Sequence, residues 1–118
     1  MLNNSLDGLV DVPATLERLG GDTARFNELA RTLPTAVQPL LTLLAEGLND
    51  SNLHFVCEAA RLLKRTLDAV EAPEVLHSVA DLEAHAYTHD FSGAAAAFLT
   101  THRLVRRLVT ELTQATPA

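Results

Sequence analysis

Hydrophobic residues recur at alternating gaps of three and four along most of the chain, which is the spacing of one face of an α-helix. The pattern is clearest in a segment with apolar residues at Leu53, Val56, Ala60, Leu63, Leu67 and Val70. Segments 26–44, 75–86 and 91–112 repeat the same rhythm. No window alternates with a period of two, so the pattern predicts helices and no strands.

Turn-forming and capping residues separate these segments. A short first helix is expected to begin at Pro13 with Asp11 or Val12 as its cap, and Gly20-Gly21 is expected to end it. The later boundaries are predicted at Asp22, in the polar stretch 47–52, at 71–73, and at Asp90 or Ser92. Pro34 and Pro39 fall inside the second helical segment, so we expect a kink or break near residues 32–34.

Four amphipathic helices joined by short turns favour an all-α fold, an antiparallel up-down four-helix bundle. The short first helix is expected to cap one end. The 118 residues are enough for one domain, with a core from about residue 11 to 114.

Composition narrows the class of protein. With 47% hydrophobic and 20% charged residues, the chain is typical of a folded domain. The net charge of −6 argues against nucleic acid or an anionic membrane as the main partner. A single cysteine, Cys57, favours a reducing cytosol, and residues 1–7 lack the features of a signal peptide. We therefore expect a cytoplasmic protein without a membrane span.

Two motifs together resemble the histidine phosphotransfer (HPt) domains of bacterial phosphorelays. The first runs from Leu16 through Gly20-Gly21-Asp22 and continues into the Phe26, Leu29 and Leu33 spacing. The second, Ala59-Ala60-Arg61-Leu62-Leu63-Lys64-Arg65 followed by Val70-Glu71-Ala72, is similar to the family's active-site helix, Ala-His-x-Leu-Lys-Gly. The resemblance covers residues 11–112 and implies the same helical bundle.

Two departures from the family pattern fall at the active-site positions. Arg61 stands where the family has its phosphorylated histidine, and Arg65 stands where the family has a glycine one helical turn later. A guanidinium is permanently protonated and only donates hydrogen bonds, so Arg61 cannot accept a phosphoryl group. Arg65 places a long charged side chain where the glycine resembles a clearance for the partner. The sequence therefore predicts no catalytic residue and no cofactor at this site.

The same helix is expected to present a binding face. His54, Arg61 and Asp68 recur at intervals of seven on one flank, which Lys64 and Arg65 extend, and Phe55, Leu62 and Ala69 form an adjacent apolar stripe. On this face Glu58 is spaced to pair with Arg61, and Asp68 with Lys64 or Arg65, as i,i+3 or i,i+4 ion pairs. In the family this face docks a receiver domain, whose active site is a pocket of carboxylates. The resemblance thus implies a non-phosphorylatable adaptor or inhibitor that binds a response-regulator receiver domain or a histidine kinase, as a monomer or weak homodimer.

Other interpretations stay open at this point. The basic residues also suit an ordinary solvated helix face, on a scaffold or homodimer without a signalling role. His54 is an alternative phosphorylation site in an active phosphotransfer protein. His85 and His89 have the i,i+4 spacing of a metal pair but lack a third ligand in the sequence. Arg103, Arg106 and Arg107 form a second basic cluster, expected away from the Arg61 face and at a solvated helix end.

Overall fold

The protein is all-helical over residues 8–115, the part of the chain that the structure, a computed structural model, describes. Five helices follow one another with no strand between them in this range: α1 (Val12–Arg18), α2 (Thr23–Asn49), α3 (Leu53–Leu67), α4 (Pro73–Tyr87) and α5 (Phe91–Ala115). The predicted all-α class is confirmed. The prediction that residues 1–7 do not form a signal peptide concerns residues outside the described range.

The helix starts follow the predicted capping residues. The side chain of Asp11 accepts a hydrogen bond from the backbone N–H of Ala14, and Asp22 accepts from Ala24 and Arg25. Asp90 accepts from the N–H of Gly93 at 2.9 Å, which settles its choice over Ser92 as the start of α5. Each carboxylate satisfies backbone donors that the first helical turn leaves unpaired.

The first turn between helices depends on two glycines. Gly20 and Gly21 have φ angles of +75° and +74°, in the left-handed region where a side chain is strained. They reverse the chain between α1 and α2, as the sequence predicts.

Helix α2 departs from the prediction at its prolines and at Gly47. It continues as one helix of 27 residues through Pro34 and Pro39, so of the kink or break expected near 32–34 the break is absent. Pro39 is exposed, and a carbonyl left without its donor there can bind water. Gly47, expected in the turn, lies inside the helix and is buried. An added Cβ at Gly47 would come within 2.8 Å of Val56 Cγ2, so the glycine allows α2 and α3 to approach closely.

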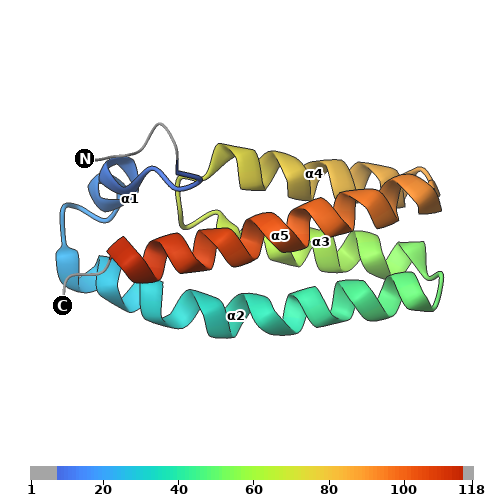
Figure 1. Ribbon diagram of the computed structural model, residues 1–118, viewed down its shortest axis with the longest axis horizontal. Coiled ribbons are helices and arrows are strands. Elements are labelled where there is room, and N and C mark those ends of the chain that lie inside the picture. Colours follow the sequence, from blue (N-terminus) through green and yellow to red (C-terminus); the bar gives the residue numbers. More distant parts are fainter. Residues whose placement is uncertain (1–7, 116–118) are drawn as a thin grey trace.

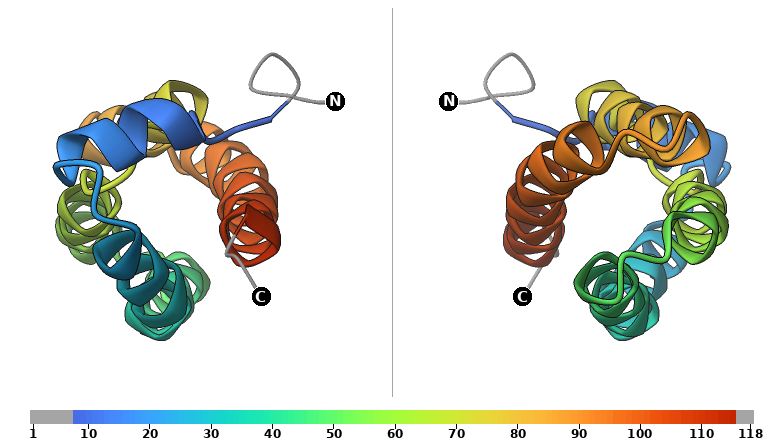
Figure 2. Two further views of the ribbon diagram at one scale, coloured as in Figure 1. Left: turned by 90° about the vertical axis from the view of Figure 1, so that its left-hand side faces the viewer. Right: turned by 90° about the vertical axis from the view of Figure 1, so that its right-hand side faces the viewer.

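The four longer helices lie side by side, and the chain crosses the molecule along each in turn (Figure 1). Helix α3 packs between α2 and α4, and α5 packs against α4 and α2. Seen end-on, α3 and α5 lie on opposite sides of the group (Figure 2). This arrangement is compatible with a helical bundle.

The core contains most of the predicted apolar positions, including Val56, Leu63, Leu82 and Leu108, which have no solvent exposure. Four apolar positions of the predicted helical spacing differ: Leu40, Leu53 and Phe98 are only half-buried, and Phe91 is exposed. On α2, Leu41 is buried in place of Leu40. Phe91 is exposed because it is the first residue of α5, at the open end of the α4–α5 turn.

Helix α1 is attached to the connection between α3 and α4. The buried Thr15 hydroxyl accepts a hydrogen bond from the N–H of Glu71 and donates to the carbonyl of Asp11. The N–H of Asp11 donates to the carbonyl of Glu71 at 2.7 Å, and Arg18 pairs with the Glu71 carboxylate. These bonds attach α1 to the α3–α4 connection at one end of the longer helices (Figure 1).

A buried polar pair joins the last two helices. Ser78 Oγ and Thr101 Oγ1 are 2.7 Å apart, and both residues are buried. Because a lone buried hydroxyl is costly, each satisfies the other, and the pair fixes α4 against α5.

Candidate partner-binding face on helix α3

Helix α3 presents the predicted binding residues on its outer side. His54, Glu58, Arg61, Arg65 and Asp68 are exposed, as the interval of seven predicts, whereas Lys64 is half-buried. The helix begins at Leu53 because the Asn52 side chain accepts a hydrogen bond from the N–H of Phe55. Its opposite face, with Val56, Ala60, Leu63 and Leu67, has almost no exposure and fixes the helix in the core.

A carboxylate from α4 holds two of the cations. Glu83 Oε2 lies 2.7 Å from Arg61 Nε, and Glu83 Oε1 lies 3.2 Å from Lys64 Nζ. The Glu83 side chain is only 19% exposed, so its charge is largely withdrawn from solvent. The hydrogen bond from Arg61 lowers the pKa of Glu83, with a further contribution from Lys64 and an opposing one from burial. We call Arg61, Lys64 and Glu83 the Glu83 clamp.

Arg61 has a second carboxylate partner on its own helix. Its Nη1 atom lies 3.3 Å from Glu58 Oε2, the i,i+3 pair expected from the sequence. The hydrogen bond to Glu83 is the main reason that the pKa of Arg61 is raised. With two carboxylates beside it, the guanidinium is positioned and permanently charged.

The other predicted ion pairs do not form. Asp68, expected opposite Lys64 and Arg65, makes no ion pair with either, because Lys64 turns to Glu83 instead. Among residues 8–115, Arg65 and His54 have no hydrogen-bonding or charged partner. Arg65 is thus the cation of this face that is available without displacing a carboxylate.

Exposed apolar side chains flank the cations. Leu62 is 43% exposed and Phe55 is 38% exposed, two turns apart on α3. Phe55 also packs near Gly47 on α2, so it is a partly covered flank residue. Leu62, next to Arg61 in the sequence, is the more accessible apolar contact.

Cys57 lies behind this face, within the core. It is 4% exposed, so it is more deeply buried than its position at the edge of the apolar seam indicates. Burial is the main cause of the raised pKa of its thiol. Such a thiol is a small apolar core residue.

His85 and His89 are not arranged as the metal pair that their spacing allows, because only His85 lies on α4. His85 Nδ1 lies 2.9 Å from Asp90 Oδ2, and its Nε2 lies 3.5 Å from Asp81 Oδ1. His89 lies in the turn after α4, with a φ of 60°. Within the described range, no group of three or more His, Cys, Asp or Glu side chains is placed to hold a metal ion.

Glu83 is the residue of this face that sequence reasoning missed. It lies 22 residues from Arg61 in the chain, and only the packing of α4 on α3 brings the two together. Its sequence signal was its place on α4, one residue after the core position Leu82. That position puts Glu83 at the border of the α4 apolar face, next to a neighbouring helix.

Comparisons with protein-family models, with curated proteins and with solved structures found no match to this chain. None of the helices in residues 8–115 is both long and apolar enough to span a bilayer.

Proposed function

We propose that this chain is an HPt-like signalling domain that docks a receiver domain or a histidine kinase through α3 and carries no phosphoryl group. The proposal includes the finer fold, an antiparallel four-helix bundle with α1 as its cap. The observation that supports it best is the exposed guanidinium of Arg61 at the centre of α3, the position of the phosphorylated histidine in the family that the sequence resembles.

The chemistry of this face suits carboxylate recognition. An arginine presents a planar set of N–H donors and no lone pair, so it binds acceptors and attacks no phosphorus. Arg61 already binds Glu83 and Glu58, which shows that carboxylates fit around it. A partner's carboxylate would exchange with Glu83 or join it, while Arg65 offers a cation one turn away that needs no exchange.

Leu62 gives the docking surface an apolar contact. Its exposed side chain lies between the two arginines in the sequence and adds buried apolar area to a contact that is otherwise ionic. A small apolar centre with charged surroundings is the usual composition of a transient interface.

Binding to purified receiver domains from the source organism tests the proposal. We expect Arg65→Glu to weaken binding by about tenfold or more, because it reverses the available cation. Arg61→Gln should weaken it as well. Arg25→Glu is the matched control, since Arg25 is an exposed arginine on α2 with a nearby carboxylate, Asp22. Equal binding by all three variants would reject the α3 face as the docking surface.

Phosphoryl transfer is tested separately. Receivers charged with acetyl phosphate should bind the protein and leave no label on it. A stable phosphohistidine on the wild-type chain would contradict the proposal. If that label disappeared in His54→Gln, the alternative of an active phosphotransfer protein would replace it.

Restoring the chemistry tests the assignment of positions. Arg61→His alone should accept label poorly, because Arg65 still hinders approach and Glu83 adds a negative charge beside the new imidazole. Adding Arg65→Gly should raise the transfer rate, and adding Glu83→Gln should raise it further. Equal rates in the single and double variants would show that Arg65 is no obstacle.

A further inference from the structure

Helices α2 and α5 pack less closely than the other neighbouring pairs of long helices. Three neighbouring cavities lie between them, of about 680, 350 and 370 Å³. Pro34 lines the first and second, and Gln38 and Leu41 line the second and third. The cavities therefore adjoin one another, and we call them together the α2–α5 groove. Helices α2 and α5 lie next to each other on the side of the molecule opposite the α3–α4 contact (Figure 2).

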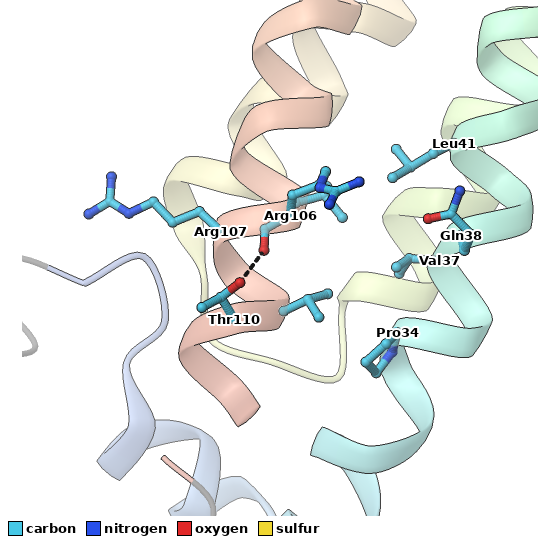
Figure 3. A pocket seen from close by; sticks show the side chains of 9 residues that line it. Pro34, Val37, Gln38, Leu41, Arg106, Arg107 and Thr110 are labelled. Carbon is cyan, nitrogen blue, oxygen red and sulfur yellow. Dashed lines mark hydrogen bonds between the residues drawn. The ribbon is translucent and has the colours of Figure 1, made fainter. Parts of the chain in front are cut away.

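The groove has an apolar floor and a polar rim. At its middle, the buried side chains of Val37, Leu41 and Val105 form the floor, and the exposed Gln38, Arg106 and Thr110 form the rim. In Figure 3 the Arg106 side chain extends across the groove toward α2, whereas Arg107 points away from it. Toward the third cavity the lining becomes more apolar, with Phe98 and the 69%-exposed Leu99.

Arg106 is the cation of this groove without a carboxylate. Arg107 pairs with Glu111 at 3.3 Å, and at the first cavity Arg31 is held by Glu28 at 2.6 Å. No ion pair joins Arg106, or Arg103 one turn before it, to a carboxylate of residues 8–115. In a protein of net charge −6, two adjacent unpaired arginines form a local positive site.

Two polar groups at the ends of the groove also lack partners. Asn27, which lines the first cavity, has a buried Oδ1 atom without a hydrogen bond in the described structure. Glu46 is exposed at the third cavity and has no ion pair among the described side chains. An occupant that donates a hydrogen bond at one end and a positive charge at the other would satisfy both groups.

The dimensions of the groove favour a helix over a small molecule. Its lining on α2 extends from Ala24 to Glu46, which corresponds to about 33 Å of helix at 1.5 Å per residue. A channel between two helices, with an apolar floor and polar rims, accepts the apolar stripe of a third helix. A small ligand would leave most of this length uncovered.

We propose that the α2–α5 groove binds an amphipathic helix of a partner protein, with an acidic side chain at Arg106 and a basic one near Glu46. The carboxylate fits the planar guanidinium, and the apolar stripe contacts the half-buried Pro34, Phe98 and Val109 that line the groove. This surface is independent of docking through α3. A chain with both surfaces would hold two different proteins on opposite sides.

Selection from a phage-displayed library of amphipathic helices tests the proposal on the full chain. The library keeps one apolar stripe and randomises the flanking positions. We expect the enriched peptides to carry Asp or Glu beside the stripe and to bind more weakly as salt rises. Enrichment of peptides without acidic residues, or no enrichment at all, would overturn the proposal.

Variants locate the peptide on the protein. Arg106→Glu should weaken binding of the enriched peptides by about tenfold or more, and Gln38→Trp should block the groove. Both positions are exposed, so both variants should fold, which circular dichroism checks. Arg65→Glu, a charge reversal on the opposite side, should leave peptide binding unchanged. Unchanged affinity in Arg106→Glu would reject the groove as the site.

The two surfaces give separable results. If the α3 proposal alone fails, Arg65→Glu leaves receiver binding unchanged while Arg106→Glu still weakens peptide binding. If the groove proposal alone fails, the reverse pattern appears. Sedimentation of the wild-type chain tests whether a second copy of the chain occupies the groove instead. A dimer that Arg106→Glu dissociates would show that it does, and would overturn the proposal of an acidic helix from a partner protein.

Discussion

Exposed arginines lie both where α3 packs against α4 and where α2 packs against α5, but the two regions differ in whether a carboxylate of the protein pairs with them. We call these contacts the α3–α4 seam and the α2–α5 seam. At the first, Glu83 joins Arg61 and Lys64 across the two helices. At the second, Arg106 extends over an open groove with no carboxylate partner in the described chain. Both arginines are exposed, yet one has its charge largely satisfied inside the protein and the other offers it to solvent.

The difference shows that exposure alone does not identify a binding cation. A guanidinium already paired must exchange one carboxylate for another, so its net gain from a partner is small. An unpaired guanidinium gains the ionic contact without giving up a carboxylate of its own protein. By this reasoning the α2–α5 groove should bind its partner with the greater electrostatic gain.

The largest expected effect compares core leucines at the two seams. Leu63 on α3 has no exposure, whereas Leu41 on α2 borders two of the groove cavities. Leu63→Ala should cost about 3–4 kcal/mol of unfolding free energy, and Leu41→Ala about 2 kcal/mol, because Leu41 has fewer neighbours to lose. Urea denaturation measures both. Equal losses would mean that the groove is packed as tightly as the α3–α4 seam.

A smaller effect is expected from the Glu83 clamp. Glu83→Gln removes the charge that joins α4 to two cations on α3, so we expect a loss of at most about 1 kcal/mol in unfolding free energy. The same variant should strengthen receiver binding, since Arg61 no longer needs to exchange a partner. Titration calorimetry checks the binding, and weaker binding in Glu83→Gln would contradict the proposed exchange.

The pH dependence of that loss has a definite sign. Because folding lowers the pKa of Glu83, its contribution is fully present above its ordinary pKa and disappears as pH falls through the lowered one. The stability difference between wild type and Glu83→Gln should therefore be constant near neutral pH and vanish in acid. Denaturation from about pH 7 down to pH 3 measures it. A difference that grows in acid would contradict the lowered pKa.

The smallest effect is expected at Arg106. Arg106→Gln removes a charge that has no ion pair within residues 8–115, so the unfolding free energy should change by less than about 0.5 kcal/mol. Arg107→Gln is the matched control, because it removes the partner of Glu111. Thermal unfolding compares the two. A larger loss in Arg106→Gln would show that Arg106 stabilises the fold.

Local signals in the sequence predicted much of the fold. The caps at Asp11 and Asp22 and the buried series from Val56 to Leu67 depend on residues close together in the chain, so spacing alone finds them. Pro34 and Gly47 misled because tertiary packing keeps α2 helical beyond the local propensity of either residue. On α2 the buried residue is Leu41 instead of the predicted Leu40, because the apolar face of a long helix shifts by one residue along its length.

The candidate surfaces were less predictable. The exposure of Arg61 and Arg65 followed from their positions on an amphipathic helix. The pairing of Arg61 with Glu83, and the groove beside Arg106, depend on how separate helices pack, and no local pattern encodes either. The sequence placed Arg106 in a basic cluster away from α3, which the opposite positions of α3 and α5 confirm. It also placed this cluster at a helix end, which is wrong, because residues 103–107 lie in the middle of α5. It gave no sign of the apolar floor beside Arg106.

The buried Ser78–Thr101 pair also limits how the groove can change shape. Sliding α5 along α4 would strand two hydroxyls in the core, so the α5 wall is locked in register. No buried pair of this kind among the described residues joins α2 to a neighbouring helix, and at Pro34 and Pro39 the backbone ladder of α2 lacks two N–H donors. We therefore expect α2 to bend at its prolines when the groove binds a bulky helix. A change in the rate at which the α2 amides exchange with deuterated solvent would detect this binding.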